Sequence, residues 1–516
     1  MRKIFLTTIA LFFFTGFVFS QTDIPLHYAE MITRSDLKKQ LTIIASEEME
    51  GRMTGSEGQR RAAAYIESQF RLMGLKAPDS LKGYQQYYQI FKDTSLPKAL
   101  KIGKQNLKYG KDYVLFSGAS VKEKFNAKSI VFCGYGIEDK NYNDYEGKNV
   151  NKKVVLILSG EPMQDGKYLT SGTDKATNWS YNVTRKVAVA KEKGALAVFF
   201  INTRMDSIPQ ENSGKRILYF PINGKAINLT TVMMPVGALE RIFNEKEIKN
   251  ILVKSESKSP LNGLIAEIKI HTKLSFEKAT TQVYPSNVIG MVEGTDKKDE
   301  YVFLTAHYDH LGKKDGVIYY GADDDGSGTV SVMEMAKAFA KAKEEGHGPR
   351  RTVVFMTVSG EEEGLWGSEY YVEHPVVPLE KTSVDLNTDM IGRIDVGRSS
   401  QKEKKYVYTV GNDKLSSDLD PISTAVNNQY IQLELDNRYN HTDPERIFYR
   451  SDHYNFARNG VPVIFYFDGI NKDYHKPTDT VDKINFELME KRVRLIFLTA
   501  WNIANRDEIL KRDKGL

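Results

Sequence analysis

The stretch YVFLTAHYDHLG, followed closely by GADDDGSG, constrains the fold of this chain more than any other part of the sequence. Its apolar start, Tyr301–Leu304, is typical of a strand buried inside a sheet. His307 and Asp309 follow at the carboxyl end of that strand, where open α/β sheets place their sites. The acidic turn Asp323–Asp325 precedes a helical pattern over about residues 329–341. A histidine and an acidic cluster at neighbouring strand ends are what a metal site requires.

Strand and helix patterns alternate from about residue 283, which predicts an α/β domain. Earlier helical patterns, at residues 35–48 and Ser56–Gly74, predict helices with a structural role only. Continuous apolar runs mark the strands, and such runs suit strands that are buried on both faces of a sheet. They lie near residues 288–292, 302–305, 352–358, 383–387 and 461–467.

Ligand-type side chains follow the predicted strands of this domain, each from a separate segment. They are His307, Asp324, Glu362, Asp389 and His475. Imidazoles and carboxylates without thiolates suit zinc or a similar divalent ion. Any one acidic residue alone would more often be a solvated loop charge, and a lone His475 would more often be a surface histidine. Their joint occurrence at strand ends of one domain favours a metal site.

The charge balance of these residues suits two metal ions. Three carboxylates and one hydroxide offset the formal charge of two divalent ions, and two zinc ions can share a bridging carboxylate and a bridging water. One further carboxylate must stay off the metals to accept the proton of the attacking water. The adjacent residues Glu361 and Glu362 suit that division, one as general base and one as ligand.

Length and composition predict a folded, multi-domain protein. The chain of 516 residues is 41% hydrophobic and 27% charged, and its formal net charge of +5 gives no reason to expect nucleic acid as a partner. Arg2 and Lys3 precede an apolar run that ends at Phe19, which predicts a signal peptide over residues 1–20. A retained membrane anchor is the alternative, although the run is short for a bilayer. Cys133 is the only cysteine, and an exported chain without disulfides fits a bacterial periplasm or the medium. We expect no stable membrane insertion after the signal peptide is removed.

The middle of the chain has a different sequence pattern, which predicts a separate β-rich insert. A helical pattern there lies among short β-rich runs, at residues 129–133, 153–158 and 195–201. Because this part contains no histidine and no carboxylates clustered at strand ends, we expect no second active site in it. The predicted parts of the mature chain are an N-terminal part at 21–125, the insert at 126–270 and the main domain at 271–516.

The chain resembles the co-catalytic zinc aminopeptidase family, which includes bacterial leucyl aminopeptidases and glutamate carboxypeptidase II. The matching blocks are AHYDHLG, GADDDGSG, GEEEGLWGS, NTDM and YHKPTDT, in the expected order. The resemblance implies a three-layer α/β/α peptidase domain with a mostly parallel, mixed central sheet, and two Zn²⁺ ions per chain. The insert resembles a protease-associated domain through GYGI and DYEGKNVNKKVVLIL, which implies no catalytic residues within it.

The resemblance also implies a role for each residue of the predicted site. The expected ligand pairs, one for each zinc ion, are His307 with Glu362 and Asp389 with His475. Asp324 would bridge the two ions, with a cis peptide bond to Asp325. Glu361 would be the general base.

Further residues would contact the ligands without binding the metal ions themselves. Asp309 would orient the imidazole of His307, and Asp479 would do the same for His475. His310 departs from the family, in which many relatives carry serine, and we expect a supporting or surface role for it.

The block YRSDHYNF matches a family segment that lines the substrate pocket. An oxyanion-stabilising tyrosine is expected nearby, with Tyr449 as the first choice and Tyr474 as the second. The consecutive residues Ser451–His453 cannot converge on one substrate atom as a serine triad must, so we expect a structural or pocket role for them.

Together these features predict an exported zinc-dependent aminopeptidase that removes N-terminal residues from peptides, with a water activated at two zinc ions and a glutamate base. A carboxypeptidase or dipeptidase is the nearest alternative. It would need a basic residue to hold a terminal carboxylate, such as Arg393, Arg446 or Arg450. A catalytically inactive binding or receptor protein is the alternative from another class, which the complete ligand set disfavours.

Overall fold

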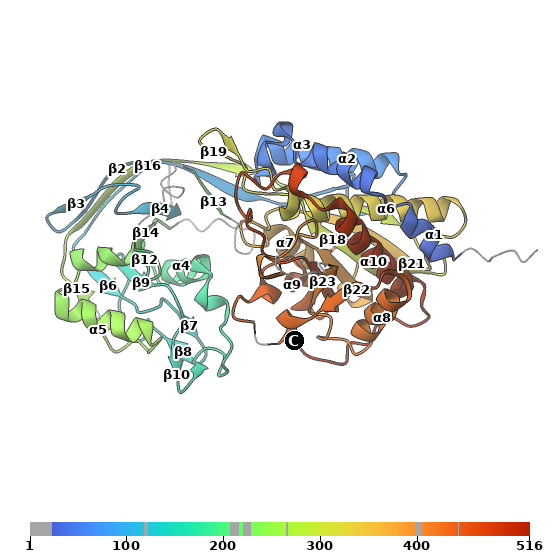
Figure 1. Cartoon of the computed structure of the whole chain (residues 1–516). Helices are drawn as coiled ribbons and strands as arrows, with labels where there is room; N and C mark the ends of the chain where they lie inside the picture. The colour runs from blue at the N-terminus through green and yellow to red at the C-terminus, as the bar shows by residue number, and fades with distance from the viewer. Residues whose placement is uncertain are drawn as a thin grey trace, which may run out of the picture.

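The computed structural model describes residues 23–117, 122–206, 216–219, 229–264, 267–398, 405–441 and 443–516. The predicted signal peptide lies outside these residues and stays a prediction. Within them, no helix is both long and apolar enough to cross a membrane. The chain forms a large α/β domain and a β-rich part, joined by a long pair of strands (Figure 1).

A mixed, mostly parallel sheet forms the centre of the larger domain. Its strands, in order across the sheet, are β1 (Gln85–Tyr87), β17 (Ser286–Val292), β21 (Arg351–Val358), β18 (Lys297–His307), β22 (Thr382–Thr388), β25 (Val463–Phe467), β23 (Tyr406–Val410) and β24 (Glu434–Asp436). The adjacent strands β21, β18, β22 and β25 run parallel. Strand β17 pairs antiparallel with β21, and β23 pairs antiparallel with β25. The strands predicted for this domain are all present.

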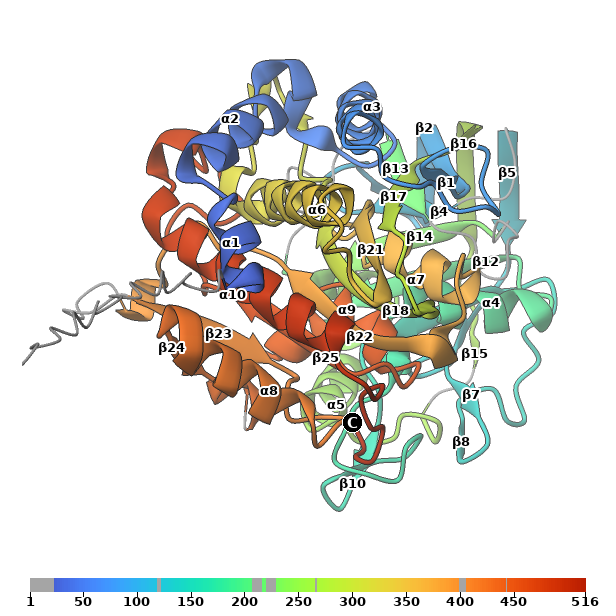
Figure 2. The ribbon, with the colours of Figure 1, turned by 90° about the vertical axis from the view of Figure 1, so that its right-hand side faces the viewer.

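Helices cover both faces of this sheet, because successive side chains of a buried strand point to opposite sides. In β21, Val353 and Phe355 join one hydrophobic core, whereas Val354 and Met356 join the other. The helices on the first face are α1 (Ile24–Glu30), α2 (Arg34–Ile44), α3 (Glu57–Leu72), α6 (Gly328–Glu344), α8 (Leu419–Val426) and α10 (Phe486–Asn505). Helices α7 (Trp366–Glu373) and α9 (His453–Ala457) pack on the second face (Figure 2). The three-layer α/β/α prediction is confirmed.

The N-terminal helices complete the first layer. The side chain of Ser56 caps α3 by accepting a hydrogen bond from the backbone of Gln59, as the sequence predicts. The buried side of α3 lies on β17, where a β-carbon at Gly290 would come within 2.8 Å of Phe70. The absence of a side chain at this position therefore allows the helix to approach the sheet closely.

The β-rich part has a hydrophobic core of its own, built from residues between Leu100 and Leu274. Its main sheet contains β15 (Glu267–Ile268), β6 (Ile130–Phe132), β9 (Val154–Leu158), β12 (Ala197–Asn202), β14 (Thr231–Pro235) and β4 (Val114–Ser117), with α4 (Val183–Glu192) and α5 (Glu245–Glu256) beside it. A second sheet contains β13 (Arg216–Tyr219), β2 (Ile90–Ile102), β16 (Thr272–Val283) and β5 (Lys122–Ala127), with β3 (Gln105–Leu107) paired to β2. The long pair β2 and β16 leads from this part to the α/β domain. The domain bounds expected from the sequence stay a prediction.

Candidate metal centre

The predicted ligands meet at one edge of the central sheet, where its parallel strands end. His307 is the last residue of β18, and Asp389 directly follows β22. Glu362 lies shortly after the end of β21, and His475 lies in the loop after β25. Because these strands are parallel neighbours, their carboxyl ends bring residues distant in sequence to the same place.

Asp324 stands between two imidazoles. It lies in the turn Ala322–Ser327 that precedes α6, and its peptide bond to Asp325 is cis, as expected. Its Oδ1 atom is 3.3 Å from Nε2 of His307, and its Oδ2 atom is 3.1 Å from Nε2 of His475. One carboxylate thus presents a different oxygen to each histidine, which is the arrangement of a bridging ligand.

The other two carboxylates pair with the histidines differently from the prediction. Oδ1 of Asp389 is 3.5 Å from Nε2 of His307, and Oε2 of Glu362 is 3.1 Å from Nε2 of His475. The predicted pairs, His307 with Glu362 and Asp389 with His475, are therefore wrong. Strand β18 lies between β21 and β22, so strand order alone leaves both partners open to His307.

The chemistry of this cluster fits divalent metal ions. His307, Asp324 and Asp389 each offer a ligand atom within 4.8 Å of the others. Nε2 of His307, Oδ2 of Asp324 and Oε1 of Glu362 are buried, and none has a hydrogen-bond partner in the described part of the chain. Buried polar atoms are normally hydrogen-bonded, so atoms of this kind gathered around a common space suit a cation between them.

Charge interactions keep the carboxylate of Asp324 ionised. Burial opposes ionisation, but the imidazoles of His307 and His475 hold the pKa of Asp324 well below its ordinary value. Burial and the charges of Asp324 and Glu362 act in opposite directions on His475, and the carboxylates prevail, raising its pKa to about 10. The imidazoles and carboxylates of the cluster thus stabilise each other's charged forms.

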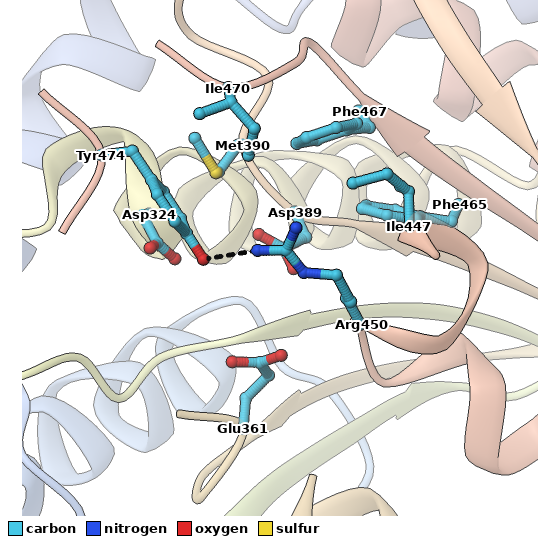
Figure 3. Close-up of a pocket in the computed structure, with 10 residues that line it drawn as sticks. All are labelled: Asp324, Glu361, Asp389, Met390, Ile447, Arg450, Phe465, Phe467, Ile470 and Tyr474. Atoms are coloured by element: carbon cyan, nitrogen blue, oxygen red, sulfur yellow. Dashed lines mark hydrogen bonds between the residues drawn. The ribbon is translucent and has the colours of Figure 1, made fainter. Parts of the chain in front are cut away.

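Glu361 lies beside the ligand pairs without belonging to either. Its Oε2 atom is 3.8 Å from Nε2 of His307, and it lines a pocket together with Asp324 and Asp389 (Figure 3). Burial raises the pKa of Glu361 well above its ordinary value, and the negative charge of Asp389 adds to this although His307 opposes it. A carboxylate with high proton affinity next to the ligands suits a general base.

Asp309 supports the site from behind. Nδ1 of His307 is 3.1 Å from the backbone oxygen of Asp309 and 3.7 Å from its carboxylate. The same carboxylate accepts hydrogen bonds from the hydroxyl of Thr54 at 2.7 Å and from the backbone of Glu361 at 3.3 Å. It therefore positions both His307 and the candidate base.

Asp479 acts on a different partner from the predicted one. Its Oδ2 atom accepts hydrogen bonds from the backbone nitrogens of Asp323 at 2.9 Å and Asp324 at 3.2 Å. It thus fixes the backbone of Asp324, whereas the prediction assigned it to His475.

Tyr474, not Tyr449, lies in the pocket wall. The hydroxyl of Tyr474 accepts a hydrogen bond from Nη2 of Arg450 at 3.2 Å, and both side chains lie across the pocket from Glu361 (Figure 3). Tyr449 is 37% exposed, and its ring packs against the guanidinium of Arg446. Tyr449, the first choice for the oxyanion tyrosine, therefore lies outside the pocket, whereas Tyr474, the second choice, lies in its wall. The remaining pocket wall is apolar and consists of Met390, Ile447, Phe465, Phe467 and Ile470.

The segment Ser451–His453 has the expected structural role. The hydroxyl of Ser451 accepts a hydrogen bond from the side chain of Asn387 at 2.8 Å. The ring of His453 is buried and stacks on Phe465, which itself lines the pocket. These contacts shape the pocket wall from behind.

Arg52 is a supporting residue that the sequence patterns did not reveal. Its buried guanidinium donates hydrogen bonds at 2.7 to 2.9 Å to the backbone oxygens of Ile44, Tyr308, Tyr320 and Gly321. Burial lowers the pKa of Arg52 to about 10, which leaves it charged at neutral pH. It ties the segment between α2 and α3 to the residue that follows His307 and to the turn that precedes Asp324. Only helices with a structural role were expected in this region, and Arg52 was not among the predicted site residues. Its one sign in the sequence is an arginine set among turn residues.

Replacing Arg52 by alanine should lower the free energy of unfolding by about 3–5 kcal/mol, because buried carbonyl groups would lose their charged donor. Denaturant titration followed by circular dichroism measures this loss. Arg60→Ala is the matched control, since Arg60 is an exposed arginine of α3 and should change the value by less than about 0.5 kcal/mol. An Arg52→Ala protein with the wild-type transition would contradict this role.

Comparison with known proteins shows which family this part of the chain is similar to. Residues 287–500, which include all five predicted ligands, match peptidase family M28. The match covers most of the α/β domain, which therefore resembles peptidase family M28. A probable leucine aminopeptidase of Trichophyton verrucosum is 27% identical over 227 residues, which are 43% of this chain and 56% of the relative. A probable zinc metalloprotease of Pyrenophora tritici-repentis is 26% identical over 264 residues, 42% of this chain and 51% of the relative. The chain thus spans about half the length of these curated relatives.

Solved structures of bacterial enzymes share the fold. An aminopeptidase from Aneurinibacillus sp. strain AM-1 has a TM-score of 0.58 at 18% identity, covering 94% of this chain and 97% of that one. BSAP, a zinc aminopeptidase from Bacillus subtilis, has a TM-score of 0.51 at 18% identity, covering 94% and 98% of the two chains. Since these alignments cover nearly the whole chain, the likeness in fold extends beyond residues 287–500.

Proposed function

We propose that this protein is an aminopeptidase that works with two zinc ions. The observation that carries the proposal is the position of Asp324, whose two carboxylate oxygens face two separate histidines, each with a second carboxylate beside it. One ion would be held by His307, Asp324 and Asp389. The other would be held by Asp324, Glu362 and His475.

The residues of the site divide the reaction among them. When bound, zinc would lower the pKa of a coordinated water and polarise the scissile carbonyl. Glu361 takes the proton of the attacking water and returns it to the leaving amine. Tyr474 donates a hydrogen bond to the developing oxyanion, because burial and the nearby charge of Asp324 raise its pKa and keep its hydroxyl protonated.

The pocket favours a free amino terminus. The free substrate amine would sit against the proposed metal pair and the nearby carboxylates, and the apolar wall beside them suits an apolar side chain. The names of the relatives, a leucine aminopeptidase and zinc aminopeptidases, support the same substrate class. Peptides are thus the proposed substrates, and the pattern of residues 1–20 supports an exported enzyme of the periplasm or the medium.

Tyr474→Phe should lower kcat by about 10²- to 10³-fold with little change in KM, because the lost hydroxyl stabilises only the transition state. Tyr449→Phe is the matched control and should retain wild-type kcat. Steady-state kinetics on a peptide substrate measures both. A large loss in Tyr449→Phe with an unaffected Tyr474→Phe would reverse the assignment.

The proposed activity is tested with paired peptides, one set with free amino termini and one set N-acetylated, followed by mass spectrometry. Stepwise loss of N-terminal residues from the free set only is the expected result. A carboxypeptidase is the second candidate, because Arg450 places in the pocket the basic residue that such an enzyme needs. Loss of C-terminal residues from both sets would establish that activity instead, and no cleavage in the presence of zinc would point to a binding protein.

A further inference from the structure

His310 lies inside the protein, beside the candidate metal ligands, and not at the surface. Its side chain is fully enclosed, with 1% of the residue exposed. Its Nδ1 atom is 2.7 Å from Oε1 of Glu362 and 3.9 Å from Oδ2 of Asp324. The ring also meets that of His475 edge to face, with centroids 5.9 Å apart. His310, Asp324 and Glu362 thus offer ligand atoms that all lie within 4.8 Å of one another.

The contact between His310 and Glu362 is not an ordinary hydrogen bond. Nδ1 and Oε1 are 2.7 Å apart, yet among the described residues neither atom has a hydrogen-bond partner of acceptable geometry. Two electron-rich atoms this close repel each other unless a proton lies on the line between them or a cation lies beside both. Nε2 of His307 shows the same combination of burial, close carboxylates and no hydrogen bond. His310 therefore shares the structural features of the predicted ligands.

The fold holds the ring of His310 in this place. A β-carbon at Gly321 would lie 2.5 Å from two ring carbons of His310, so only glycine leaves room for the imidazole. The backbone of Gly321 is held in turn by the guanidinium of Arg52, which donates to its carbonyl at 2.9 Å. An imidazole confined on this side is preorganised toward the carboxylates.

We propose that His310 is an additional ligand, through Nδ1, of the metal ion held by Asp324, Glu362 and His475. This inference rests on the proposed two-zinc function and adds a residue to it. The two metal positions then differ, because this one has two imidazoles and the one at His307 and Asp389 has a single imidazole. Since imidazole is a stronger ligand for zinc than carboxylate or water, the position at His310 takes the first equivalent of zinc.

Zinc titration of the metal-free protein against a chromophoric chelator tests the assignment. The wild type should bind two zinc ions in two steps of unequal affinity. His310→Ala should weaken the tighter step by more than about 100-fold, a larger loss than removal of an outer-shell partner causes, and should leave the weaker step unchanged. His347→Ala, at an exposed histidine beyond α6, is the matched control and should titrate as wild type.

His310→Asn separates a ligand from a hydrogen-bonding role. Its amide can donate a hydrogen bond to Glu362 but is a poor zinc ligand, so the variant should lose zinc affinity as His310→Ala does. Wild-type affinity in His310→Asn would overturn the proposal and make His310 a positioning residue. Unchanged titration of His310→Ala would overturn it as well.

X-ray absorption at the zinc edge needs no variant and counts the imidazoles directly. The expected count in the wild type is three imidazoles for two zinc ions, and a count of two would overturn the assignment of His310. Failure of the underlying function is distinguishable, because a wild-type protein that binds fewer than two zinc ions would reject the two-zinc proposal itself.

Discussion

Glu361→Ala should lose nearly all peptide hydrolysis, by about 10²- to 10⁴-fold in kcat, while its zinc content stays at the wild-type level. The reason is positional. Glu361 lies 3.8 Å from Nε2 of His307 and lines the pocket, but the closest histidine–carboxylate contacts belong to Asp324, Asp389 and Glu362. Removing it takes away the proton acceptor and leaves both proposed ligand sets intact.

Steady-state kinetics measures the loss of turnover, and elemental analysis of the same protein sample measures the zinc content. Glu361→Gln should behave like the alanine variant, because an amide cannot accept the proton. Glu369→Ala is the matched control. Glu369 lies on α7 and pairs with Arg458, so this variant should keep wild-type activity. Retained turnover in Glu361→Ala would remove the base assignment, and loss of zinc would make Glu361 a ligand.

Asp324→Ala should have the largest effect of any single substitution, because one carboxylate serves both metal positions. We expect fewer than one zinc ion per chain after dialysis and turnover at the background level. The protein should also lose the stabilisation that bound zinc provides, which for one ion at a thousand times its dissociation constant is about 4 kcal/mol. Elemental analysis and thermal unfolding with and without added zinc measure these losses.

The control for Asp324→Ala is Asp36→Ala, at a partly exposed residue of α2 that pairs with Lys337. It should keep full zinc content, and its unfolding should still respond to chelator as in the wild type. Two tightly bound zinc ions in Asp324→Ala would contradict the bridging role, and one retained ion would show that the two positions do not depend on each other.

The sequence predicts the strands and most of the cluster because each rests on a local pattern. Continuous apolar runs mark β18, β21, β22 and β25, and parallel strands bring the residues at their carboxyl ends to one edge of the sheet. His307 and Asp389 could be assigned to the cluster in this way before any contact was known. The same logic extends to the N-terminus of α3, where the capping hydroxyl of Ser56 is a local signal.

The remaining features depend on contacts between segments far apart in the chain, which no local pattern records. Strand order leaves both Glu362 and Asp389 open to His307, and the contact that the structure shows, with Asp389, depends on the loops beyond the strand ends. The guanidinium of Arg52 reaches carbonyls more than 250 residues away, and nothing near it in sequence signals those partners. Tyr449 and Tyr474 both follow from the family resemblance, but only their side-chain directions separate an exposed ring from one in the pocket wall.

The proposal that Asp324 bridges two zinc ions is tested most directly by anomalous diffraction at the zinc edge. The crystals needed are those of the zinc-loaded protein. We expect two peaks, one among His307, Asp324 and Asp389 and one among Asp324, Glu362 and His475. A single peak, or peaks away from Asp324, would contradict the bridged pair.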